Sequence, residues 1–199
     1  MQSKMGMSVM DGESLNNPVT SWSVAKGDLP SHVLAAAESG RIFLLPDKEI
    51  DGVGIYRDDV AGLVKTLRHN GIDIDFSHAR QDRRYLSEYG ANEGIVAAIG
   101  LAIAANYAGD FVKVIARIAW NRARSALGAN STTEEIDSAN VTVRVAEIVR
   151  NDQGTVIRGL EVTGQVQDLD NLLNDAFSER RTSELPSSGP DAADSEVPE

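Results

Sequence analysis

Residues 94–109 read GIVAAIGLAIAANYAG, sixteen consecutive residues without a charged side chain, and this stretch decides how the fold is assembled. Apolar residues continue beyond it at helical spacing, from Phe111 through Ile118 to Leu127. Gly109 followed by Asp110 is typical of one helix ending and another beginning. We therefore expect a long, kinked apolar helix, or two short ones, buried under a small sheet.

Two alternatives are open for residues 94–120: insertion into a membrane, and a surface for a partner or for self-association. The uncharged run is shorter than the roughly twenty residues that span a bilayer. Extending it brings in Asp110, Lys113 and Arg117, each of which is costly near the bilayer centre. We therefore expect a buried helix and no membrane association.

Upstream of this stretch, the pattern predicts a β-α-β unit preceded by a short helix. Asp28 and Pro30 are typical of a helix start. The expected elements are a helix over 32–39, a buried strand over 41–45 (RIFLL), a capped helix over 60–70 and an alternating strand over 72–76 (IDIDF). The intervening segments 47–59 and 79–92 are expected to be loops, the second with a short helix as the alternative.

Downstream, two alternating segments flank the turn sequence NDQG at 151–154 and predict a β-hairpin over 141–163. A C-terminal helix is expected from Asp168 onward, and its apolar face consists of Leu169, Leu172, Leu173, Ala176 and Phe177. The expected fold class is α+β: β-α-β, then the long or kinked apolar helix, the hairpin and the C-terminal helix. One domain is expected over 20–181, between disordered tails at 1–19 and 182–199.

Charge and composition exclude several classes of protein. The 199 residues carry a net charge of −11 and include no cysteine, which rules out a disulfide framework and thiolate zinc sites. Such a chain suits a reducing compartment, and the first nineteen residues lack the apolar segment of a signal peptide, so we expect a cytoplasmic protein. The acidic charge repels phosphate backbones and argues against general nucleic-acid binding.

Four residues share one narrow face of the helix expected after Gly109: Lys113, Arg117, Trp120 and Arg124. A tryptophan within a basic stripe predicts a binding site for an anion or an acidic partner. The alternative is a solvated face on which long side chains cover the tryptophan. Residues 182–199, with five acids and no base, are an intramolecular candidate to occupy this stripe.

A second candidate is the basic-aromatic patch of Arg80, Arg83, Arg84, Tyr85 and Tyr89. It could hold an anion, a nucleotide or a partner, and the alternative is ion pairing with Asp82 and Glu88 of the same segment.

The candidate for chemistry is the set Asp73, Asp75 and His78, a carboxylate-histidine group that could bind a divalent metal or act as a general base. The alternative is the wet side of an edge strand. Phosphate-binding loops and hydrolase or kinase motifs are missing from the sequence, so we expect no cofactor. A small metal- or anion-binding enzyme domain built on residues 73–89 is the alternative function.

The order of the predicted elements also suggests a family. The stretches that carry it are DDVAGLVKTLRHNGIDIDF (58–76), the apolar region 94–128, VTVRVAEIVRNDQGTVIRGLEV (141–162) and DLDNLLNDAF (168–177). This layout resembles the effector-associated constant component proteins of bacterial conflict systems, small proteins encoded beside variable effectors. The resemblance covers about residues 53–177 and lies in layout and hydrophobic character. It implies a non-enzymatic accessory or adaptor protein of a bacterial defence or signalling system, with a protein partner or self-association and no catalytic residues.

Overall fold

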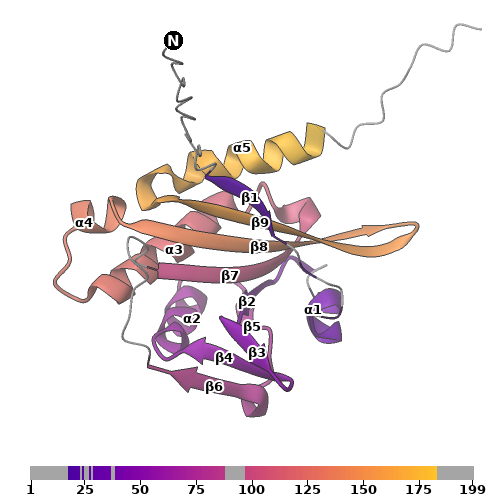
Figure 1. The fold of residues 1–199 in the computed structure, drawn as a ribbon, viewed down its shortest axis with the longest axis horizontal. Helices are drawn as coiled ribbons and strands as arrows, with labels where there is room; N and C mark the ends of the chain where they lie inside the picture. The colour runs from indigo at the N-terminus through magenta and orange to yellow at the C-terminus, as the bar shows by residue number, and fades with distance from the viewer. Residues whose placement is uncertain are drawn as a thin grey trace, which may run out of the picture.

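A six-stranded mixed sheet in the order β1-β9-β8-β7-β2-β5 forms the centre of the fold (Figure 1). Its strands are β1 (Val19–Trp22), β2 (Ile42–Leu45), β5 (Ile74–Phe76), β7 (Ala97–Ala104), β8 (Asn140–Asn151) and β9 (Gly154–Gln165). A smaller sheet in the order β3-β4-β6 consists of β3 (Lys48–Ile50), β4 (Val53–Arg57) and β6 (Arg83–Leu86). In Figure 1 this small sheet lies at the lower end of the molecule.

The structure is a computed structural model and describes residues 18–22, 24, 27, 29–36, 39–87 and 97–182. The two predicted tails fall outside these ranges, except that Pro18 and Val19 are described and that Thr182 ends the last helix.

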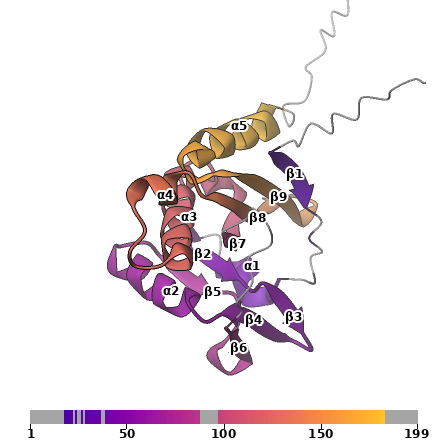
Figure 2. The same cartoon turned by 60° about the vertical axis from the view of Figure 1, so that its left-hand side comes forward.

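Helices cover both faces of the large sheet unequally. On one face lie α2 (Val60–His69), α3 (Val112–Leu127) and α5 (Leu169–Thr182), with the short α4 (Thr133–Asp137) between α3 and β8. On the other face lies α1 (Ser31–Ala36), which covers only one end of it (Figure 2). The expected α+β class is confirmed.

The largest correction concerns the apolar stretch. Residues 97–104 form β7, a central strand, and not the first half of a helix. This strand pairs in parallel with β8 over its whole length and antiparallel with β2, where Leu45 lies opposite Gly100. A strand with neighbours on both sides and helices over its faces is apolar throughout, which is why its sequence looked helical. The second half of the prediction is confirmed as α3, which a turn around Gly109 and Asp110 separates from β7.

Two predicted loops contain strands. Within 47–59, β3 and β4 form a hairpin whose turn residues Asp51 and Gly52 both have positive φ, 51° and 76°. This is the backbone that Asp-Gly turns favour in tight hairpins. Within 79–87, a 3₁₀ turn over Arg80–Asp82 leads into β6, which pairs in parallel with β4. Residues 88–92 of the second predicted loop lie outside the described part of the chain.

Most of the remaining elements agree with the sequence, except for β1 and α4, which were not predicted. β2 and β5 are parallel and joined through α2, so the β-α-β unit is confirmed. The hairpin of β8 and β9 is confirmed, with Asn151 opposite Gly154 at its turn. The C-terminal helix is confirmed as α5, and the short helix over 32–39 is present as α1.

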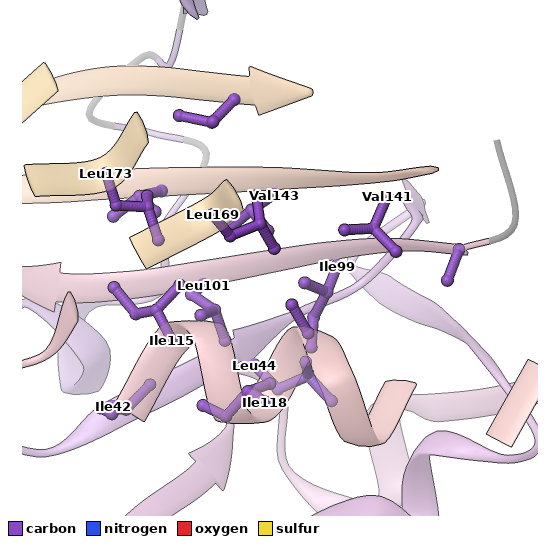
Figure 3. Close-up of a cluster of buried hydrophobic side chains, with 14 of the residues drawn as sticks. Ile42, Leu44, Ile99, Leu101, Ile115, Ile118, Val141, Val143, Leu169 and Leu173 are labelled. Atoms are coloured by element: carbon purple, nitrogen blue, oxygen red, sulfur yellow. The ribbon is translucent and has the colours of Figure 1, made fainter. Parts of the chain in front are cut away.

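The main core lies between the large sheet and the helices α2, α3 and α5 (Figure 3). Ile115 and Ile118 of α3 point toward Ile99 and Leu101 of β7, and all four side chains are buried. α5 contributes Leu169 and Leu173 to the same core, and both side chains are fully buried. In Figure 3, Leu169 lies beside Val143 of β8. The second cluster, under α1, is smaller and includes Val33 and Phe43.

The two adjacent leucines of α5 provide a matched test of this core. Leu173 is fully buried, whereas Leu172 is only partly buried. We expect Leu173→Ala to lower the free energy of unfolding by about 3 kcal/mol and Leu172→Ala by about 1 kcal/mol, because only the first leaves a closed cavity. Urea unfolding followed by circular dichroism measures both values, and equal losses would contradict this packing.

Candidate functional site

The three residues predicted to carry chemistry do not converge. Asp73 forms an ion pair with Arg41 at 3.0 Å. Asp75 contacts Arg68 at 2.6 Å and Arg83 at 3.9 Å. His78 points elsewhere, so each carboxylate is held by an arginine and not by the imidazole. Among the described residues, no three histidine, aspartate or glutamate side chains gather closely enough to hold a metal ion.

His78 instead joins a buried network beside the small sheet. Its Nε2 lies 3.1 Å from Glu49 Oε2, and its Nδ1 lies 3.1 Å from Ser77 Oγ and 3.2 Å from the Tyr56 hydroxyl. The two hydroxyls are 3.0 Å apart. Sequence reasoning missed Glu49, Tyr56 and Ser77, because β3, β4 and β5 bring them together from distant positions.

The order carboxylate, imidazole, hydroxyl is that of a nucleophilic relay, but the hydroxyls are inaccessible. Ser77 is 0% exposed and Tyr56 is 1% exposed. Burial raises the pKa of the Tyr56 hydroxyl above its ordinary value, against the effect of its hydrogen bond with Ser77. The tyrosine therefore stays protonated, and the network satisfies buried polar groups where Ser77, just after β5, contacts Tyr56 of β4.

The predicted basic-aromatic patch divides into an inner and an outer part, and its Tyr89 lies outside the described residues. Arg83 is turned inward: its Nε donates to the His78 carbonyl at 2.6 Å, and its guanidinium lies 4.1 Å from the centre of the Phe76 ring. Arg80 and Arg84 are exposed, and Tyr85 is 43% exposed at the end of an aromatic cluster with Tyr56 and Phe76. Only the outer residues are accessible to a partner.

The basic stripe on α3 has the expected layout. Lys113, Arg117 and Arg124 are exposed, and Trp120 is partly buried. The indole Nε1 of Trp120 donates to Asp137 Oδ1 at 3.0 Å, and the Arg124 guanidinium lies 5.7 Å from the indole ring. This geometry agrees with the alternative in which a long basic side chain covers the tryptophan. A site for an anion or partner on this stripe stays a prediction.

The outer face of the small sheet is an accessible apolar surface. The strand registers place Ile50, Val53, Ile55 and Leu86 on this face, together with the basic residues Lys48, Arg57 and Arg84. Ile50 is 55% exposed and Leu86 is 42% exposed, whereas Val53, Ile55 and Arg57 are partly buried. We call these seven residues the outer surface of the small sheet.

A buried ion pair near this sheet was also missed by sequence reasoning. Arg122 of α3 is 2% exposed, and its Nη1 donates to Asp59 Oδ2 at the start of α2. Burial, and then repulsion by Arg57, lowers the pKa of Arg122 to about 10. The signal was in the sequence, because Arg122 lies seven residues after Ile115 and therefore on the buried stripe of α3.

Three comparisons with known proteins give no relative. No family model matches the chain, and neither the curated proteins nor the solved structures include a significant match. The described helices include none with both the length and the apolar character needed to span a bilayer.

The Asp59–Arg122 pair makes a testable statement about stability. Asp59→Ala leaves the buried guanidinium unpaired and should lower the free energy of unfolding by about 3 kcal/mol. In Asp59→Ala combined with Arg122→Met most of that loss should be recovered, because the charge that needs a partner is gone. Asp59 makes no side-chain hydrogen bond as the helix cap, so the loss is not a capping effect.

The sign of the Arg122 shift leads to the same expectation. A base whose pKa falls to about 10 on folding holds its proton less tightly in the folded chain, so its charge opposes folding at neutral pH. Replacing the arginine therefore removes a cost that pH would relieve only above about 10. A double variant as unstable as Asp59→Ala alone would contradict the interpretation that the unpaired charge of Arg122 causes the loss.

Proposed function

We propose that this chain is a non-enzymatic adaptor that captures an extended, acidic segment of a partner protein by adding it as a strand beside β6. The adaptor role is the one that the layout resemblance implies, a component of a bacterial defence or signalling system, although residues 97–104 of that layout form a strand. The observation that carries the proposal is the edge of β6, which no described strand covers, next to the outer surface of the small sheet.

The backbone of β6 is oriented for strand addition. The Asp58 amide donates to the Leu86 carbonyl at 3.2 Å, so the backbone groups of Leu86 face β4. Neighbouring residues of a strand direct their backbone groups to opposite sides, and those of Tyr85 and Arg83 therefore face the open edge. A segment lying there would gain main-chain hydrogen bonds, the basis of β-strand addition.

Side chains beside this edge favour an acidic segment with apolar residues. Leu86 and Tyr85 offer accessible apolar area on the two faces of the sheet, and Arg80 and Arg84 add positive charge. Charged residues on an edge strand also discourage self-association. Arg84 covers the Arg83 carbonyl at 2.8 Å, which blocks part of the edge to a second copy and would be displaced by a carboxylate partner.

An enzymatic role for residues 73–89 has less support. The carboxylates of Asp73 and Asp75 are held by arginines, and the hydroxyls around His78 are buried.

The test places a photo-crosslinking residue, p-benzoylphenylalanine, at Tyr85 and, as a control, at Val156, which is exposed on β9. We expect crosslinks from position 85 to map to an extended acidic segment of another protein. A synthetic peptide of that segment should bind the purified chain, and its affinity should fall as the salt concentration rises.

Variants then decide how the peptide is held. Tyr85→Pro removes the amide that faces the open edge and keeps those that pair with β4, so peptide affinity should fall at least about tenfold. Arg84→Glu should weaken binding similarly, while Val156→Asp should not. Circular dichroism checks that each variant folds, and Arg84→Glu keeps the test decisive if the proline variant does not fold. Crosslinks within copies of this chain, or peptide binding that neither substitution changes, would contradict the proposal.

A further inference from the structure

We propose that a cavity on the far side of the large sheet binds a small zwitterionic molecule with an apolar group, the chemistry of a free α-amino acid. This site goes beyond the adaptor function and is separate from the β6 edge. The cavity has a volume of about 400 Å³, within the usual range of small-molecule sites.

The floor of the cavity is the face of β7 that points away from α3. Ala98 and Gly100 lie there, next to Leu45 of β2. A Cβ atom at position 100 would lie only 3.1 Å from the Leu45 Cβ, so a side chain there would crowd Leu45. Glycine therefore leaves space above the strand at this point. The other end of the same face is filled by α1, whose Val33 packs near Ala102 and Ala104. The cavity therefore lies over the end of this sheet face that α1 does not cover.

The walls provide an apolar surface for a side chain. Trp22 at the end of β1 and Leu29 before α1 form one side, and Leu45 with Pro46 forms another. Trp22 is only partly buried, so a ligand in the cavity can still cover part of its ring. An aliphatic or aromatic group in contact with these residues would be removed from water, which is the main favourable term in such sites.

Charged groups of both signs meet at the cavity. Arg144 of β8 lines it and contacts Glu161 through Nε, and its Nη groups form no hydrogen bond with the described residues. Lys48 is a second cation in the lining. The carboxylates are Glu49, whose Oε2 contacts His78, and Asp51 in the turn of the β3–β4 hairpin.

This mixture selects the class of ligand. A phosphate or another multiply charged anion would be repelled by Asp47, Glu49 and Asp51, and a simple cation would leave Lys48 and Arg144 without a partner from the ligand. A zwitterion can place its carboxylate near Arg144, where a guanidinium binds carboxylates in a bidentate way, and its ammonium near the acids. Its side chain then lies against Trp22 and Leu45.

The experiment screens the free proteinogenic L-amino acids at millimolar concentration by thermal shift, with isothermal titration calorimetry for any that raise the melting temperature. We expect at least one apolar amino acid to bind. Its N-acetyl derivative and its amide, which lack one charge each, should bind at least about tenfold more weakly. Fluorescence of Trp22 in a Trp120→Phe background should change on binding, which places the ligand in this cavity.

Matched substitutions complete the test. Ala98→Leu fills the floor and should abolish binding, while Ala61→Leu, the same change at an exposed position of α2, should not. Arg144→Gln should remove the preference for the free carboxylate over the amide. The proposal is overturned if no amino acid binds, if blocked derivatives bind equally well, or if Ala98→Leu leaves the affinity unchanged.

Discussion

The pairing of β7 with β8 on one side and with β2 on the other is the constraint on which the rest of the structure depends. It joins the β2-α2-β5 unit to the β8-β9 hairpin and α5, two halves that make no other sheet contact within the described part of the chain. Along β7, large residues (Ile99, Leu101, Ile103) alternate with small ones (Ala98, Gly100, Ala102, Ala104). The large residues form the core with α3, and the small ones leave room for α1 and for the cavity.

The spacing of apolar residues was sufficient to predict the type of element wherever one face of the element is polar and the other apolar. α2, the β8–β9 hairpin and α5 each present one face to water, so their sequences carry the period of the element. The large residues of β7 face α3, and the small ones face α1 and the cavity, so its period-2 signal lies in size instead of polarity. A reading that scored large against small residues over 98–104 would have identified the strand.

The candidate sites were harder to predict than the fold, because polar side chains find partners from distant elements. Arg41 reaches Asp73, Arg68 reaches Asp75, and Glu49 reaches His78. In these contacts, the side chains that a local sequence pattern suggested for catalysis are already paired with other residues of the chain. The groups left over lie in part on strands that the sequence did not predict, β6 at the open edge and β3 and β7 at the cavity. Only the three-dimensional structure brings them together with groups of β2 and β8.

The measurement that tests the central claim most directly is the set of Cα chemical shifts from NMR of the isotopically labelled chain. The structure requires a strand over 97–104 followed by a helix over 112–127. We therefore expect Cα shifts below the random-coil values across the first segment and above them across the second. Shifts above the random-coil values through 97–104 would show that this segment is helical. The large sheet would then lack its central strand and the cavity its floor, which would contradict the structure.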